Sequence, residues 1–111
     1  MKAHALHGHL DALLLAVLEK GPLHGYAIIE ALLSRSGGVL DLPTGTVYPA
    51  LRRLERAGYV ESVWSTVNGR QRRTYRLTAA GRDALVGERT AWQEFSATVS
   101  RFLGQAPATP A

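Results

Sequence analysis

The sequence of 111 residues predicts a mainly α-helical fold with one small β-hairpin and a long C-terminal helix. Two observations predict it. Apolar residues recur at helical spacing in three segments before Gly58, and again after Thr78. Between these segments the apolar period falls to two on both sides of Asn68-Gly69, a dipeptide typical of tight hairpin turns. Three helices followed by a hairpin is the order of elements in a winged helix-turn-helix.

The first two helices are defined by their apolar stripes and by the residues that stop them. The first begins near Leu10 and is expected to end before Gly21-Pro22. The second is expected from about His24 to Ser36, where Gly37-Gly38 stop it. Its expected inner stripe consists of Tyr26, Ile29, Leu32 and Leu33.

The third helix is expected to begin in the segment Thr44-Gly45-Thr46, which can cap it, and to end at Gly58. Pro49 should limit where the helix begins, because proline is tolerated only near the first turn. The inner face of this helix is expected to consist of Val47, Ala50, Leu51, Leu54 and Ala57. The opposite face is then free to meet a partner.

The remaining elements are two strands and a long helix. Alternating residues predict strands at Tyr59–Ser65 and Arg72–Leu77. Thr78 is placed to cap the last helix, which should end near Leu103. The sequence therefore divides into three expected parts: a winged helix-turn-helix domain over residues 1–77, a dimerisation helix over residues 78–103, and a disordered tail over residues 104–111.

Composition excludes several classes of protein. The chain has no cysteine, which excludes disulfides, thiolate metal sites and thiol nucleophiles. Its longest dense apolar stretch, Ala12–Leu18, is too short for a membrane helix, and the first residues do not resemble a signal peptide. No motif of a serine hydrolase or of a phosphate-binding loop occurs. We therefore expect a cytoplasmic protein that is not an enzyme and needs no cofactor, metal or membrane.

Positive charge is concentrated in the middle of the chain. The sequence has 13 basic and 9 acidic residues, yet eight arginines lie between Arg52 and Arg82 against only Glu55 and Glu61. A basic block of this kind indicates a surface that faces a polyanion, although a solvated charged face gives the same pattern. Arginine favours nucleic acid, since its guanidinium pairs with phosphates and with guanine edges.

The third helix and the hairpin carry the residues expected to bind DNA. The major groove accepts a helix, where arginine pairs with guanine and threonine methyl groups contact thymine. The residues expected near base edges are Thr44, Thr46, Tyr48, Pro49 and Arg53. Those expected to contact phosphates are Arg52 and Arg56 in the helix, and Arg70, Arg72 and Arg73 at the hairpin tip. The alternatives are a helix with solvated arginines and a tip whose charge only discourages sheet pairing.

The last helix carries apolar residues that a single chain has little core to cover. The seam consists of Leu85, Trp92 and Val99, which are seven residues apart, with Phe95 and Phe102 in a second row. Together with Leu14 of the first helix, this seam is expected to form the interface of a homodimer; packing within one chain is the alternative. Two-fold symmetry then predicts a pseudo-palindromic DNA operator with half-sites about one helical turn apart.

Three ordered motifs resemble those of one family. The segment PTGTVYPALRRLERAGYV at residues 43–60 resembles the recognition-helix signature of PadR-family transcriptional regulators. His24-Gly25-Tyr26 and the segment RRTYRLTAAGR at residues 72–82 fit the same family. The resemblance covers about residues 10–103. It implies a dimeric, usually repressing, DNA-binding protein of the shorter kind, with a single C-terminal helix.

The resemblance also implies a site for an effector. Some members of the family bind flat aromatic compounds between their subunits, stacked on a tryptophan of the last helix. Trp92 stands at the matching position, with Phe95 close by in the sequence. Trp92 as plain dimer core is the alternative. Trp64, near the end of the first strand, is expected to be a packing residue of the hairpin.

Two other functions stay open. A winged helix-turn-helix can act as a protein-interaction module that does not bind DNA, in which case the protein would not be retained on DNA at low salt. A metal-responsive regulator could use His4, His7 and His9, because His4 and His7 can share one helical face and imidazole binds zinc. Both functions are compatible with the same fold.

Overall fold

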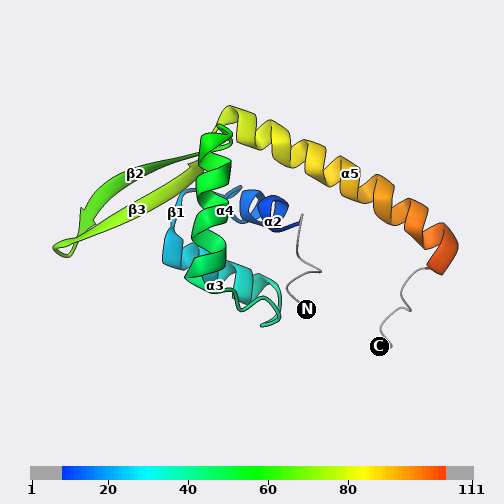
Figure 1. Ribbon diagram of the computed structural model, residues 1–111, viewed down its shortest axis with the longest axis horizontal. Helices are drawn as coiled ribbons and strands as arrows, with labels where there is room; N and C mark the ends of the chain where they lie inside the picture. The colour runs from blue at the N-terminus through cyan, green and yellow to red at the C-terminus, as the bar shows by residue number, and fades with distance from the viewer. Residues whose placement is uncertain (1–8, 105–111) are drawn as a thin grey trace.

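The computed structural model describes residues 9–104 and confirms the predicted fold class. Its elements in chain order are α2 (Leu10–Val17), β1 (Leu23–His24), α3 (Gly25–Arg35), α4 (Thr44–Arg56), β2 (Val60–Val67), β3 (Arg70–Leu77) and α5 (Ala79–Leu103). Figure 1 shows α2, α3 and α4 gathered in one body, with the β2–β3 hairpin extending from one side and α5 from the other. The molecule is therefore elongated, with extents of 53 × 29 × 27 Å.

The hairpin is longer than its sequence pattern indicated. β2 and β3 pair in antiparallel register along their whole length, from Val60 opposite Leu77 to the residues that flank the turn. Asn68 and Gly69 connect the strands with φ angles of 52° and 77°, the left-handed conformations that a two-residue hairpin turn of type I′ requires. The predicted turn is confirmed, and both strands extend up to it.

A third, short strand was not expected from the sequence. Leu23 and His24 form β1, which pairs with the edge of β3 that β2 leaves free. The expectation that His24 begins the second helix is therefore off by one residue, since α3 begins at Gly25. A two-residue strand has no period, so its sequence carries no pattern that could indicate it.

α4 begins earlier than Pro49 suggested. Pro43, rather than the residues after it, is the N-cap, and its carbonyl oxygen accepts the N–H groups of Thr46 at 3.0 Å and Val47 at 3.1 Å. Pro49 lies in the second turn, so the expectation that it marks the first turn is wrong. The N–H that proline lacks would have met the carbonyl of Gly45, a residue exposed to solvent, where water can replace it.

One hydrophobic core joins the three helices of the body to the sheet and to the start of α5. The largest fully buried side chains are Leu14, Leu18, Ile28, Val47, Leu51 and Val60. In α3 the buried side chains are Ile28 and Leu32, whereas Tyr26 and Leu33 are exposed. The stripe expected for this helix is therefore partly wrong, and Tyr26 is free to take part in a surface.

Two of the six residues expected in a dimer interface lie in this core instead. Leu14 is 0% exposed and Leu85 is 3% exposed within a single chain, so neither has surface left for a partner. Leu85 is buried because the first turns of α5 pack against α2 and β3. α5 is thus continuous with the winged helix-turn-helix at its start and leaves the body further along, as Figure 1 shows.

The start of α5 forms a close joint with the turn between α4 and β2. The Thr78 hydroxyl caps α5 by accepting the N–H of Gly81 at 3.0 Å, and it donates to the carbonyl of Gly58 at 2.6 Å. The N–H of Thr78 donates to the carbonyl of Tyr59 at 3.1 Å. A Cβ atom at Gly81 would overlap that same carbonyl. The predicted cap is confirmed, and glycine is what allows the close approach.

Two further contacts hold α5 where it leaves the body. Arg89 donates to both carboxylate oxygens of Glu19, at 2.7 and 2.6 Å. This hydrogen bonding lowers the pKa of Glu19 and raises that of Arg89. The Trp92 ring meets the His9 imidazole edge-on, with ring centroids 5.8 Å apart. Arg89 and Trp92 lie three residues apart, on the same face of α5, and their contacts hold this face of the helix against Glu19 and His9.

We predict that Gly81→Ala lowers the stability of the fold. The added methyl group meets the backbone of Tyr59, and a shift there would disturb the joint, so we expect a loss of about 1–3 kcal/mol. Gly87→Ala is the matched control, because Gly87 is an exposed residue of the same helix with open space around it. Alanine there should stabilise the helix by up to about 1 kcal/mol. Urea unfolding followed by circular dichroism measures both, and equal effects would contradict a tight joint.

Candidate nucleic-acid interface

α4 divides its side chains sharply between core and solvent. The buried face consists of Val47, Ala50, Leu51 and Leu54, none more than 3% exposed. The opposite face exposes Thr44, Gly45, Thr46, Arg52, Arg53 and Arg56. Tyr48 and Pro49 are half-buried between the two faces. The outer face predicted from the sequence is therefore present, with its threonines towards the N-terminus and its arginines towards the C-terminus.

Tyr48 lies against the first residue of α3. A Cβ atom at Gly25 would come within 2.6 Å of the Tyr48 ring, so glycine at this position makes room for the tyrosine. The contact explains why a glycine follows His24 at the start of the helix. Tyr48 thereby fixes the spacing between α3 and α4, in addition to the contact with DNA expected of it.

Arg53 is paired with an acidic residue of another helix. Its Nη2 atom donates to Oδ1 of Asp11, in the first turn of α2, at 2.9 Å. Both side chains are about half exposed, and a pair of this kind contributes only about 0–1 kcal/mol to stability. A stronger partner can therefore take the guanidinium at little cost. No sequence pattern indicates this pair, because its members are 42 residues apart.

The three arginines expected to act together at the hairpin tip lie on two faces of the hairpin. Arg72 pairs with Ser65 and Arg73 with Trp64, and consecutive residues of a strand point to opposite faces. Arg70 and Arg72 are exposed, as expected. Arg73 is half-buried and hydrogen-bonded to protein groups, which sets it apart from the other two arginines; its expected contact with phosphate stays a prediction.

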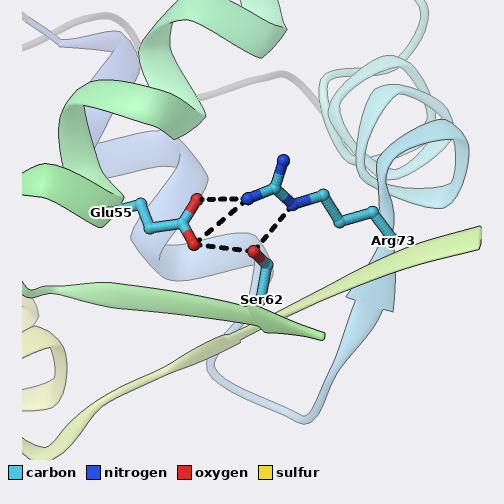
Figure 2. A network of polar contacts seen from close by, with 3 residues as sticks. All are labelled: Glu55, Ser62 and Arg73. Atoms are coloured by element: carbon cyan, nitrogen blue, oxygen red, sulfur yellow. Dashed lines mark hydrogen bonds and ion pairs between the residues drawn. The ribbon is translucent and has the colours of Figure 1, made fainter. Parts of the chain in front are cut away.

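Figure 2 shows what Arg73 contacts. Its Nε atom donates to the Ser62 hydroxyl at 2.8 Å, and its Nη2 atom donates to Oε1 of Glu55 at 3.2 Å. The Ser62 hydroxyl donates in turn to Oε2 of Glu55 at 2.7 Å. The guanidinium also lies 5.4 Å from the centroid of the Trp64 ring and 5.9 Å from that of Tyr75. The last turn of α4 is therefore tied to both strands of the hairpin.

A groove of 730 Å³ lies between the start of α3, the outer face of α4 and the hairpin. Its lining includes four arginines and four aromatic residues, namely Arg52, Arg70, Arg72, Arg73, Tyr26, Tyr48, Trp64 and Tyr75. Arginine supplies hydrogen-bond donors for phosphate oxygens, and aromatic rings pack against sugars and bases. The groove is chemically suited to a sugar-phosphate backbone.

Two aromatic residues of the groove differ from their sequence-based interpretation. Trp64 was expected to pack within the hairpin, but it is 62% exposed and faces the groove beside Arg73. Tyr26 was expected in the core of α3, but it is 64% exposed at the groove's edge. Strand alternation places Trp64 on the same face of β2 as Val60, so the sequence could have indicated which face of the hairpin Trp64 occupies. Nothing in the sequence marks Tyr26 as exposed.

The metal hypothesis falls largely outside the described part of the chain. His4 and His7 precede residue 9, and only His9 of the three histidines is described. Within residues 9–104 there is no cluster of three or more side chains that could hold a metal ion. In the same range, no helix has the length and apolar character needed to cross a membrane.

Comparison with known proteins places these features in a family. The model of the transcriptional regulator PadR-like family matches residues 14–86. The chain belongs to the PadR-like family. The match runs from α2 to the start of α5, and it therefore includes both α4 and the hairpin.

Relatives of known sequence or structure agree with this assignment. A transcriptional regulator of Mycobacterium tuberculosis is 38% identical over 99 residues, which are 89% of this chain and 81% of that protein. A PadR-family transcription regulator from Clostridium difficile has a TM-score of 0.77 at 32% identity, covering 87% of this chain and 100% of that one. A transcriptional regulator from Clostridium thermocellum has a TM-score of 0.83 over 90% of this chain and 98% of that one; at 24% identity it supports the fold alone.

Membership of the family establishes the broad function. PadR-like proteins are transcriptional regulators rather than enzymes, and they bind DNA, typically as dimers. The arginine-rich surface formed by α4, the groove and the hairpin is the part of this chain whose chemistry fits that function.

Proposed function

We propose that this PadR-like protein is a homodimeric repressor that binds a pseudo-palindromic operator. In each half-site α4 enters the major groove, and the hairpin lies along the adjacent sugar-phosphate backbone. The observation that supports this proposal best is the division of α4: its inner face is buried, so its threonines and arginines point outward beside a groove lined with arginine.

The residues of the interface have different proposed roles. Thr44 and Thr46 lie in the first turn of α4, the part of a recognition helix that comes closest to base edges. Arg53 contacts a guanine after leaving Asp11, whose carboxylate holds it only weakly. The proposed phosphate contacts are made by Arg52, Arg56, Arg70 and Arg72. Tyr48 and Pro49 complete the surface between these groups.

Arg53→Ala tests the proposed contact with a base. An operator is first obtained by selecting bound fragments from random duplex DNA. Binding to that operator should weaken by about 1–3 kcal/mol, and binding to random DNA by less, because only the operator offers the matched base. Arg101→Ala is the control, since it removes the same charge from the exposed far end of α5. Equal losses on both DNAs would make Arg53 a phosphate contact.

The proposed dimer uses the apolar side chains that α5 leaves in water. Trp92, Phe95 and Phe102 are 54%, 59% and 84% exposed within one chain. Val99 lies half-buried on the same face of the helix. Exposed aromatic residues on one face of a helix indicate a partner surface, and the same face on a second copy is self-complementary under two-fold symmetry.

Phe95→Asp should convert the dimer to monomers and weaken binding to the operator. Phe95 is exposed in the single chain, so the substitution spares the core but places an unpaired carboxylate in the proposed interface. Ala97→Asp is the matched control, because Ala97 is also exposed but lies on the opposite side of the helix. Sedimentation measures both variants. A Phe95→Asp protein that stays a tight dimer would place the interface elsewhere.

We also propose that a planar aromatic effector binds beside Trp92 and Phe95 in the dimer. Their rings lie 6.1 Å apart at 41°, and both are more than half exposed, so an aromatic face is available to a ligand. In a Trp64→Phe background, an effector should quench Trp92 emission and release DNA over the same concentration range. Quenching that leaves the affinity for DNA unchanged would make Trp92 plain dimer core.

A further inference from the structure

We propose that Glu55 is a positioning residue for DNA binding, which sets the angle of the hairpin against α4 through Ser62 and Arg73. The inference rests on the proposed function, and it concerns a residue whose charge is opposite to that of the surface around it. An acidic side chain in a DNA-binding face is expected to oppose binding; the geometry assigns Glu55 the reverse effect.

Three elements meet at Glu55. It lies in the last turn of α4, whereas Ser62 belongs to β2 and Arg73 to β3. Each of the three side chains contacts the other two, so the hydrogen bonds in Figure 2 close a ring. The Arg73 and Glu55 side chains are 37% and 29% exposed, so this ion pair is more buried than the Arg53–Asp11 pair. A closed ring with partial burial defines one position of the hairpin relative to the helix.

The ring is the outermost anchor of the hairpin. All residues from 63 to 72 are exposed, so beyond Ser62 the strands have little packing against the body. The tip at Asn68 lies six residues further along, a distance of about 20 Å at about 3.3 Å per residue. A rotation of about 10° at the ring would move the tip by about 3 Å, which is the length of a hydrogen bond. Contacts of the tip with phosphates therefore depend on this anchor.

The sign of the charge separates the two possible roles of Glu55. Glu55 and Glu61 are the only acidic residues of the sequence between Thr44 and Leu77. If Glu55 acted only through its charge, its removal would tighten the binding of a polyanion. Glu61 supplies a built-in comparison, because it also pairs with an arginine of β3, Arg76, but on the opposite face of the hairpin.

A lysine substitution at Arg73 distinguishes a positioning role of this residue from a phosphate contact. The ring needs two N–H groups of a planar guanidinium, one directed to Ser62 and one to Glu55. Lysine would keep the charge that a phosphate contact requires but not this fixed fork. A positioning role therefore predicts that lysine fails at residue 73, and a phosphate contact predicts that lysine suffices.

The first experiment measures binding to a random-sequence duplex by fluorescence anisotropy at several salt concentrations. Glu55→Ala and Arg73→Lys should each weaken binding about tenfold. The salt slope should not change, because the same phosphate contacts form once the hairpin is ordered on the DNA, and the double variant should bind no more weakly than either one. The matched control Glu61→Ala should bind as well as the unmodified protein, or better. Thermal unfolding checks that each variant is folded. If Glu55→Ala does not fold, Ser62→Ala replaces it, because that substitution removes only the bridging hydroxyl.

Two results would overturn the proposal. One is tighter binding by folded Glu55→Ala, which would leave its carboxylate as an ordinary repulsive charge. The other is Arg73→Lys binding like the unmodified protein while Arg73→Ala lowers the salt slope by about one, which would make Arg73 a phosphate contact.

The second experiment needs no DNA. The chain has no cysteine, so Thr46→Cys in α4 and Thr66→Cys in β2 provide two exposed sites for spin labels. With labelled chains diluted into unlabelled ones, the label-to-label distance should have a narrow distribution, also in Glu61→Ala, and a broad one in Glu55→Ala. A narrow distribution in Glu55→Ala would refute the positioning role whatever the DNA result. A broad one in a protein that binds no DNA would refute the proposed function alone.

Discussion

Burial of the inner face of α4 is the constraint on which the rest of the structure depends. Burying a side chain such as Val47, Leu51 or Leu54 stabilises the fold by about 1.5–3 kcal/mol, whereas the exposed Arg53–Asp11 pair contributes about 0–1 kcal/mol. The apolar stripe therefore decides the rotation of the helix, and the polar contacts follow from it. With this face fixed, Thr46 and Arg53 point outward, so the proposed DNA-binding surface is formed before any DNA is bound.

Both arms of the molecule are attached at the same end of that helix. Glu55, in its last turn, holds the hairpin, and the turn that follows, at Gly58 and Tyr59, holds the start of α5 through Thr78. The hairpin lies on the proposed DNA-binding side, whereas α5 carries the proposed dimer interface. The two functions are thus joined through a few residues of backbone rather than through a separate linker. Displacement of α5 in a dimer would act on the part of α4 from which the hairpin extends.

The sequence predicted those features whose signal is local, and missed those that depend on partners distant in the chain. The Thr78 cap and the Asn68-Gly69 turn each need only their own neighbours, and both are confirmed. Heptad spacing predicts Leu85 in a dimer seam, but spacing alone cannot distinguish a partner's surface from the chain's own core, where Leu85 lies. The sequence predicts a phosphate contact for Arg73 but does not indicate its hydrogen bonds to Ser62 and Glu55, because these partners lie 11 and 18 residues away. Strand alternation would have separated it from Arg72, but it could not have supplied the carboxylate.

The central claim is that the outer face of α4 contacts base edges in the major groove. Mapping of guanine contacts on a selected operator tests this claim most directly. Methylation of guanine N7 places a methyl group in the major groove. If α4 binds as proposed, methylation should block binding in two clusters about one helical turn apart, one for each half-site of the operator. Binding that is indifferent to N7 methylation, or blocked only by changes in the minor groove, would contradict the account.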